Sequence, residues 1–307
     1  MEKEVNYQNL PVLTGLILKA TGGFYYVKVN ETLYECRARG SFRKEDTSPL
    51  VGDTVQIYEL PNEKGYIKAI IGRKNSLVRP PLANLDQLVM VVSVRDPSPN
   101  LLVLDKLIAV AEKQDLEPVI VFTKTDLGDS TSYADIYRKA GFQVFEVCSK
   151  EHRGTEGIKE MLKGKISAFC GNSGAGKSSL LNEIFPGLGL STADISKKLG
   201  RGRHTTRTTE LFELREGGYV ADTPGFSAIE MERVGIIRKE RLQNCFREFE
   251  PYILQCKFTG CSHTSEKGCA ILQKVNEGII PKSRHENYCI MYEDAKKLND
   301  WELEDDE

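Results

Sequence analysis

Hydrophobic and polar residues alternate in short runs over the first quarter of the chain. The runs are rich in Val, Ile and Tyr, and Gly or Asn residues separate them. Alternation with a period of two residues, interrupted in this way, is typical of half-buried strands joined by tight turns. Five strands in succession predict a small β-barrel, most simply an OB-fold. The expected strands are residues 12–19, 24–29, 33–37, 54–59 and 66–71.

From about residue 85 the pattern changes to apolar runs that alternate with longer amphipathic stretches. Strands separated by helices predict a mostly parallel sheet covered by helices, which is the α/β class. The expected strands are residues 88–94, 119–122, 143–147, 166–170 and 219–221, and the expected helices are residues 100–114, 133–140, 155–162 and 177–184.

After residue 233 the strand pattern stops, and a helix, a cysteine cluster and a second helix follow. The chain then ends in an acidic tail, residues 301–307, which we interpret as a solvated terminus. The sequence therefore predicts three domains: a barrel over residues 1–75, an α/β domain over residues 76–232 and a helical, metal-binding domain over residues 233–307.

Residues 171–178 read Gly-Asn-Ser-Gly-Ala-Gly-Lys-Ser and fit the phosphate-loop pattern G-x-x-x-x-G-K-[ST] in full. The pattern lies between a predicted strand and a predicted helix, as phosphate binding requires, so a mere glycine-rich turn is the weaker interpretation. Backbone N–H groups would wrap the phosphates, Lys177 would bridge the β- and γ-phosphates in catalysis, and Ser178 would bind Mg²⁺. The expected nucleotide contacts are Gly171, Asn172, Ser173, Gly174, Ala175, Gly176, Lys177, Ser178 and Ser179.

A second phosphate element follows the predicted strand 219–221 and reads Asp-Thr-Pro-Gly. Asp222 would hold Mg²⁺ through water, and the amide of Gly225 would meet the γ-phosphate. Taken alone this tetrapeptide is a common turn, so its position carries the interpretation.

The base-reading element lies upstream of the phosphate loop. Thr123, Lys124, Thr125 and Asp126 resemble the N-K-x-D guanine motif, and Ser149 lies in a segment that resembles its supporting S-A-K element. A carboxylate at position 126 can accept hydrogen bonds from guanine N1–H and the 2-amino group, which adenine cannot supply. Thr123 replaces an amide that ties the two loops together, so we expect modest affinity. Each of these two segments alone could be a surface turn.

The motifs occur in the order base, support, phosphate loop and Asp-x-x-Gly, which is a cyclic rotation of the usual GTPase order. A sheet needs its strands adjacent in space and not in sequence, so a rotated chain keeps the site if the former ends are joined. The expected join is residues 155–164. The agreement of all four motifs with one rotated order predicts a circularly permuted P-loop GTPase domain.

The spacing Cys-x4-Cys-x-His-x5-Cys places three thiols and one imidazole within a short segment. Four such ligands are what a structural Zn²⁺ site needs, and they leave no open position for a substrate. Incidental thiols are the alternative. The expected ligands are Cys256, Cys261, His263 and Cys269.

Composition and charge limit the remaining possibilities. The chain is 40% hydrophobic and 28% charged with a formal net charge of −2, and its first residues lack a basic and apolar leader. No apolar run approaches the roughly 18 residues of a membrane span. We therefore expect a cytoplasmic protein, in which clustered cysteines indicate metal before disulfides.

Basic residues suited to a nucleic acid occur in all three predicted domains. Residues 195–209 contain five cations and no acid, although a solvated loop would look the same. Aromatic residues that could stack on bases accompany arginines in the barrel. The alternative is that half of these rings only fill the barrel core. The aromatic and basic barrel residues are Phe24, Tyr25, Tyr26, Tyr34, Arg37, Arg39, Arg43 and Lys44. We expect RNA as a partner.

With its barrel, its rotated motifs, Gly-Arg-Gly-Arg-His-Thr-Thr at residues 200–206 and its cysteine cluster, the chain resembles the RsgA (YjeQ/YloQ) family of GTPases. The resemblance implies slow GTP hydrolysis stimulated by the small (30S) ribosomal subunit, contact with its 16S rRNA, assistance in its late maturation and release of assembly factors. Since Phe226 replaces the usual glutamine, the candidate for orienting water is His204, with Thr205 and Thr206 near Mg²⁺. A solvated histidine is the alternative, and the resemblance favours catalysis.

Two other functions fit the same residues. The chain could be a binding module in which GTP orders the fold and hydrolysis is incidental, or a GTPase that acts on another RNA or a transport substrate. Comparing the GTPase rate with and without small subunits would distinguish the binding module from a GTPase that RNA stimulates. No heptad repeat suggests a permanent dimer, so a monomer is expected.

Overall fold

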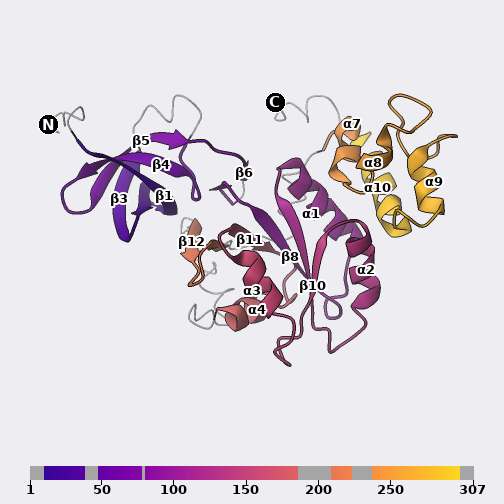
Figure 1. Cartoon of the computed structure of the whole chain (residues 1–307), viewed down its shortest axis with the longest axis horizontal. Helices are drawn as coiled ribbons and strands as arrows, with labels where there is room; N and C mark the ends of the chain where they lie inside the picture. The colour runs from indigo at the N-terminus through magenta and orange to yellow at the C-terminus, as the bar shows by residue number, and fades with distance from the viewer. Residues whose placement is uncertain (1–9, 39–47, 78–79, 186–208, 223–236, 298–307) are drawn as a thin grey trace. The chain divides into compact units, whose positions relative to one another are not determined.

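The computed structural model describes residues 10–38, 48–77, 80–185, 209–222 and 237–297 (Figure 1). The chain divides into two compact units. The first comprises residues 1–86, 162–168 and 193–225, and the second comprises residues 87–161, 169–192 and 226–307. No helix in the described ranges is long and apolar enough to span a membrane.

The first unit contains the predicted five-stranded barrel, and its β3 and β5 are parallel neighbours. The strand order is β1-β2-β3-β5-β4, and pairing of β1 with β4 closes the barrel. Inward-facing Ile17, Val27, Val55, Ile57 and Ile67 are fully or almost fully buried, which accounts for the alternating pattern in the sequence. The strands are β1 (Val12–Thr21), β2 (Phe24–Val29), β3 (Thr32–Ala38), β4 (Thr54–Leu60) and β5 (Lys64–Ile71).

A short ribbon follows the barrel, formed by β6 (Ser76–Leu77) and β7 (Leu82–Ala83). The segment that leads into it is held to the barrel by Arg73, whose Nε and Nη2 donate to the buried Asp53 carboxylate at 2.9 and 2.6 Å. Asn84 adds a hydrogen bond from its amide to Gly52 O at 3.0 Å. The sequence pattern did not predict this ribbon, because two-residue strands carry no periodicity.

The same unit contains an antiparallel hairpin of β12 (Thr209–Glu213) and β13 (Tyr219–Asp222). Strand β13 also pairs in parallel with the start of β11 (Ile166–Cys170). The free edge of β12 pairs with β1 of the barrel, where Lys19 Nζ lies 2.8 Å from Glu210 Oε2. Strand β12 was not predicted, and within this unit it pairs with β1 on one side and with β13 on the other.

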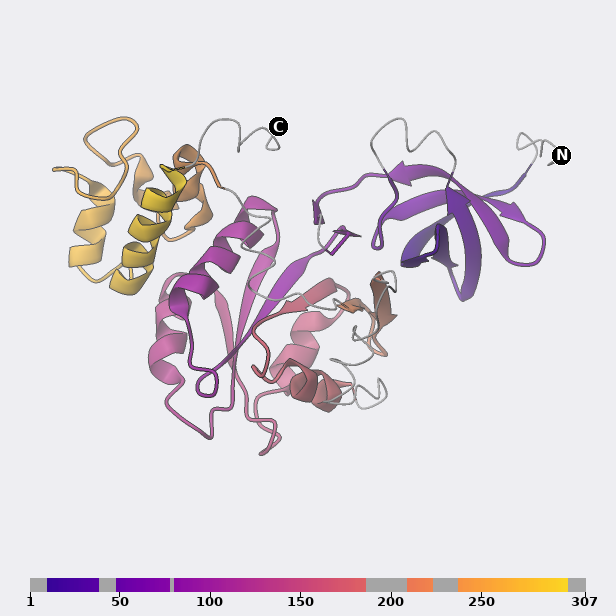
Figure 2. The ribbon, with the colours of Figure 1, turned by 180° about the vertical axis from the view of Figure 1, so that it is seen from behind.

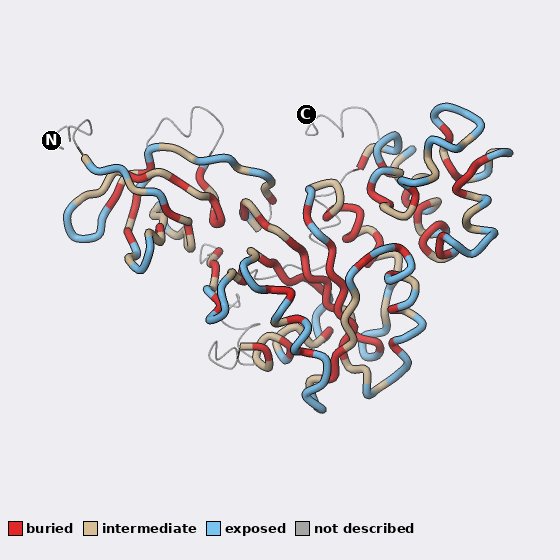
Figure 3. Tube along the Cα trace, viewed as in Figure 1, coloured by how far each residue is buried: buried red, intermediate tan, exposed pale blue. Residues whose placement is uncertain are grey.

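The second unit contains the other α/β strands, in the order β10-β9-β8-β11. Strands β8 (Gln87–Ser93), β9 (Glu117–Thr123) and β10 (Gln143–Glu146) run parallel. Almost every residue of β8 and β9 is buried, as Figure 3 shows at the centre of the sheet, so these strands read as continuous apolar runs.

The helices of this unit begin within two residues of the predicted positions. They are α1 (Leu101–Lys113), α2 (Thr131–Lys139), α3 (Glu156–Leu162) and α4 (Lys177–Ile184). Helix α1 begins at a side-chain cap, because Asn100 Oδ1 accepts a hydrogen bond from Val103 N at 3.1 Å. Its buried face includes Leu104, Leu107 and Ile108.

The C-terminal segment of the second unit is helical and packs against α1 (Figure 2). Its core contains Phe246, Phe249, Ile271 and Tyr288, and Ala109 of α1 belongs to the same cluster. A fully buried Arg284 connects the two parts by donating to Asp105 and Glu248 at 2.7 Å each. The elements are α7 (Lys239–Leu242), the 3-10 helix η4 (Gln243–Cys245), α8 (Glu250–Ile253), α9 (Ala270–Asn276) and α10 (Lys282–Ala295).

Candidate nucleotide-binding site and metal centre

The phosphate-loop sequence forms a tight turn between β11, which ends at Cys170, and α4, which begins at Lys177. Three of its glycines have positive φ angles: 147° at Gly171, 78° at Gly174 and 89° at Gly176. A Cβ atom on Gly171 would lie 2.2 Å from Val91 O, so no other residue fits there. The loop therefore runs close against β8, and no side chain caps the first N–H groups of α4. Such a helix N-terminus suits a phosphate.

The Lys177 side chain folds back over the loop that precedes it. Its Nζ donates to Gly171 O at 2.6 Å and to Asn172 O at 2.9 Å. Burial lowers the pKa of Lys177. The ammonium is thus held at the loop by two carbonyl groups and lies where phosphate oxygens could replace them as partners.

The base-motif loop is tied to the phosphate loop by a single buried hydroxyl. Thr123 ends β9, and its Oγ1 donates to Ala175 O at 2.6 Å. Thr123 lacks the amide that the guanine motif usually has, but its hydroxyl still reaches the phosphate loop. The modest affinity expected from the missing amide stays a prediction. Gly176 lies beside this hydroxyl, and its φ of 89° is the feature that favours glycine, because a Cβ atom there would make only an ordinary contact of 3.4 Å with Thr123 Oγ1.

The remaining base-motif residues lie on the loop that follows β9. Asp126 accepts a hydrogen bond from Lys150 Nζ at 3.1 Å, and this bond lowers the pKa of the Asp126 carboxyl. The Lys124 ammonium contacts Asp96 O, and Thr125 Oγ1 accepts from Arg153 at 3.3 Å. Ser149 is half-buried and adjoins Lys150. The fold therefore brings together an ionised carboxylate, its supporting segment and the phosphate loop.

The other predicted nucleotide and magnesium residues are described only in part. Asp222 is the last residue of β13, and its backbone pairs with Glu210 of β12. The Asp222 side chain, and the whole of His204, Thr205, Thr206 and Gly225, lie outside the described residues.

The predicted metal ligands converge between α8 and α9. One ligand atom from each of Cys256, Cys261, His263 and Cys269 lies within 4.8 Å of the others. All eight cysteines of the chain are free thiols, so no disulfide competes for this group. Burial raises the pKa of the Cys261 thiol to about 12, so this thiol would ionise at neutral pH only with a cation bound beside it. The donor set fits one tetrahedral divalent ion.

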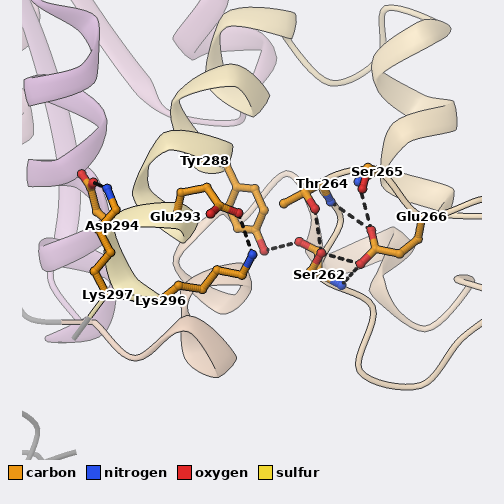
Figure 4. A network of polar contacts seen from close by, with 9 residues as sticks. All are labelled: Ser262, Thr264, Ser265, Glu266, Tyr288, Glu293, Asp294, Lys296 and Lys297. Atoms are coloured by element: carbon orange, nitrogen blue, oxygen red, sulfur yellow. Dashed lines mark hydrogen bonds and ion pairs between the residues drawn. The ribbon is translucent and has the colours of Figure 1, made fainter. Parts of the chain in front are cut away.

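The loop that contains Cys261 and His263 is held by hydrogen bonds to Glu266, and Figure 4 shows those from Ser262, Thr264 and Ser265. Glu266 accepts backbone hydrogen bonds from Ser262, Thr264 and Ser265 at 2.7, 3.1 and 3.2 Å. Burial alone would raise the pKa of Glu266, but the bonds from Ser262 and the backbone lower it to about 2. Tyr288 of α10 donates to Ser262 O at 2.9 Å. These hydrogen bonds fix the loop that contains Cys261 and His263.

Family models match most of the chain in two adjoining parts. The model of the RsgA N-terminal domain matches residues 14–67, and that of the RsgA GTPase matches residues 70–232. The chain belongs to the RsgA GTPase family. It is therefore a GTP-hydrolysing enzyme that binds guanine nucleotides, and the resemblance inferred from its motifs is confirmed.

Relatives and solved structures match this chain over nearly its full length. RsgA of Caldanaerobacter subterraneus subsp. tengcongensis, named a small ribosomal subunit biogenesis GTPase, is 43% identical over 93% of this chain and 96% of its own. RsgA of a Geobacillus species is 44% identical over 92% of this chain and 97% of its own. The crystal structure of YjeQ from Thermotoga maritima has a TM-score of 0.80 at 34% identity, covering 94% of this chain and 100% of that one.

The predicted permutation is confirmed by a further solved structure, that of YloQ, a circularly permuted GTPase. It has a TM-score of 0.76 at 35% identity and covers 96% of this chain and 98% of its own. The rotated motif order in the sequence thus corresponds to a real rearrangement of the fold.

Sequence reasoning missed the residues that hold the C-terminal segment and its metal ligands. Arg284 and Asp105 pair across 179 positions, and Gln243 reaches His263 across 20. None of these residues belongs to a recognisable sequence motif, so the sequence offered no signal. Tyr34, predicted among the RNA-facing aromatics, instead lies in the barrel wall with 9% exposure, and its hydroxyl bonds Glu59.

Proposed function

We propose that this GTPase assists late maturation of the small (30S) ribosomal subunit, and that the subunit stimulates its hydrolysis of GTP to GDP and phosphate. The release of assembly factors would follow hydrolysis. The proposal is supported by the names of the relatives, which describe small-subunit biogenesis GTPases. The observation that supports the nucleotide site in this proposal is the hydrogen bond from Thr123 to Ala175 O, which ties the base loop to the phosphate loop.

In this proposal Asp126 selects guanine. Its carboxylate is ionised and bound to Lys150, so it can accept hydrogen bonds from N1–H and the 2-amino group. The phosphates lie against the N-terminus of α4, where Lys177 exchanges its carbonyl partners for phosphate oxygens. Further contacts come from Thr123, Lys124, Thr125, Ser149, Gly171, Asn172, Ser173, Gly174, Ala175, Gly176, Ser178, Ser179, Asp222 and Gly225.

We also propose the residues that hold Mg²⁺ and complete hydrolysis. Ser178, Thr205, Thr206 and Asp222 would hold the ion, which supplies positive charge to the β- and γ-phosphate oxygens when bound. Lys177 would stabilise the same oxygens. His204 would orient the attacking water, because the position after Asp222-Thr223-Pro224-Gly225 is Phe226, which has no hydrogen-bonding group.

The ion at the cysteine cluster is proposed to be one structural Zn²⁺ per chain. Three thiols and an imidazole are the ligands that zinc prefers, and no open position remains for a substrate. Its role would be to hold the segment between α8 and α9, which has few apolar residues of its own.

The barrel is proposed to contact 16S rRNA. Arg37 lies over the ring of Phe24 at 4.7 Å, and Lys68 lies over Tyr58 at 5.7 Å. Pairs of this kind present both a cation and a ring to a nucleic acid. We propose the domain limits 1–75, 76–232 and 233–307, a monomer, and the cytoplasm, where ribosomal subunits are assembled.

The decisive experiment measures GTP turnover by the purified chain alone, with purified small subunits and with purified large subunits. We expect stimulation by the small subunit only. His204→Ala should bind GTP but lose the stimulated rate, whereas His152→Ala, a matched change at an exposed histidine that contacts Glu183, should retain it. An unchanged rate with small subunits would overturn the proposal in favour of a module that GTP merely orders. Stimulated turnover in His204→Ala would remove His204 from the mechanism.

A further inference from the structure

The two ring nitrogens of His263 face different partners. Nδ1 lies 3.5 Å from Cys256 Sγ and 3.4 Å from Cys269 Sγ, on the side where the four ligand atoms converge. Nε2 lies 2.7 Å from Gln243 Oε1, on the opposite side of the ring. A neutral imidazole carries one hydrogen, and the nitrogen without it is the one that can bind a metal ion.

Gln243 is placed by the packing of its own segment. It opens η4, whose Cys245 is buried together with the following Phe246, and both belong to the same core as Ala109 of α1. The next polar residues, Arg247 and Glu248, form ion pairs with Glu112 and Arg284. The amide of Gln243 is therefore presented to His263 by a segment fixed to the α/β part of the unit, and not by the metal-binding loop itself.

We propose that Gln243 is a positioning residue for the metal centre. Its Oε1 accepts the Nε2 hydrogen of His263, so that the free electron pair lies on Nδ1 and points toward the three thiolates. This inference rests on the proposed metal site, and adds which nitrogen binds the ion and which residue determines it. It also makes η4, and through it the contact with α1, part of the support of the metal centre.

Other contacts near His263 cannot take this role. His285 Nε2 bonds the backbone oxygen of His263 at 2.8 Å and leaves the ring free to rotate. Phe249 packs edge-on against the ring with 6.1 Å between the centroids, which limits its tilt but does not select a nitrogen. Among the described residues, the amide of Gln243 is the polar group placed to fix the hydrogen on Nε2.

The first test compares metal affinity among three variants of the zinc-loaded full-length chain. Gln243→Met keeps the length of the side chain but removes the acceptor, and Gln243→Glu keeps an acceptor oxygen. Gln273→Met is the matched control, because Gln273 lies on α9 and its side-chain amide donates to Glu277. Affinity is measured by competition with a chromogenic zinc chelator, and the metal content is measured on the same samples.

We expect Gln243→Met to weaken zinc binding by about 10- to 100-fold, which is the usual effect of losing a partner behind a metal ligand. Gln243→Glu and Gln273→Met should stay close to the unmodified protein. Equal affinity in Gln243→Met and the unmodified protein would overturn the inference and leave the metal site standing. Absence of zinc from the unmodified protein, in contrast, would overturn the proposed site itself.

A second measurement does not depend on any variant being folded. In zinc-loaded protein labelled with ¹⁵N at histidine, long-range ¹H–¹⁵N spectra distinguish a protonated nitrogen from a metal-bound one, and the chain has only four histidines. We expect His263 to show a protonated Nε2 and a bound Nδ1. The reverse assignment would refute the role of Gln243 whatever the chelator experiment shows.

Discussion

Replacement of Arg284 should detach the C-terminal segment from helix α1. The Arg284 side chain is completely buried, and the two carboxylates it binds have side-chain exposures of 1% at Asp105 and 5% at Glu248. In Arg284→Met the side chain still fills space beside Phe246, over which the guanidinium now lies at 4.6 Å. The variant therefore removes the charge and the hydrogen bonds while keeping much of the packing.

The loss of stability in Arg284→Met depends on which hydrogen bonds the two buried carboxylates keep. Asp105 keeps a hydrogen bond from Asn287 at 2.6 Å, but Glu248 loses both bonds that it accepts from Arg284. Breaking one side of a buried ion pair typically costs about 3–5 kcal/mol. In a unit of this size that corresponds to a fall in melting temperature of roughly 6–20 °C.

The loss should depend on pH. Burial raises the pKa of Asp105, and the Arg284 guanidinium opposes that shift. Without Arg284 the pKa rises further, so the folded state binds the proton more tightly than the unfolded state does. The carboxyl then contributes stability that is present at low pH and is lost as the pH rises from about 4 through the folded-state pKa.

The assay is thermal unfolding of both proteins between pH 5 and pH 8, with hydrogen exchange of α10 as the local measurement. We expect the difference between the proteins to grow with pH, and the triple variant Arg284→Met, Asp105→Asn, Glu248→Gln to recover stability. A loss below about 1 kcal/mol that does not change with pH would be that of a surface ion pair, and would refute the reasoning.

Three further predictions concern the nucleotide and the metal. Asp126→Asn should weaken GTP binding and shift preference toward xanthosine nucleotides, whose 2-position offers an acceptor. Competition binding that still shows a preference for GTP would contradict the role of Asp126. Thr123→Val should lower the affinity for GTP and GDP alike, because it leaves the buried carbonyl of Ala175 without its donor. Such a loss costs about 1–3 kcal/mol, or roughly 5- to 150-fold in affinity. Thr123→Ser keeps the hydroxyl and should keep the affinity. Titration calorimetry that finds Thr123→Val unchanged would show that Ala175 needs no such donor. Removal of zinc by a chelator should expose the amides of residues 256–269 to hydrogen exchange and leave β8 and β9 protected, so equal protection before and after would contradict a structural metal.

The sequence determined the features that depend on neighbouring residues. Period-two alternation located the barrel strands, apolar runs located β8 and β9, and the phosphate-loop pattern fixed the boundary between β11 and α4. The cysteine and histidine spacing was enough to predict the metal cluster, because all four ligands lie in one short loop. The motif order revealed the permutation, because cyclic rotation leaves each local motif intact.

Only the tertiary structure decided how distant segments support one another. A periodic pattern shows that a face is buried but not which partner buries it, so the sequence could not show that β12 extends the sheet from β1 or that Arg284 joins α10 to Asp105. The sequence shows that Thr123 lacks the usual amide, and only the structure shows that its hydroxyl reaches Ala175 O. Gln243 had no motif to mark it, because its role depends on one hydrogen bond, and hydrogen bonds between distant residues are determined by the packing of the whole unit.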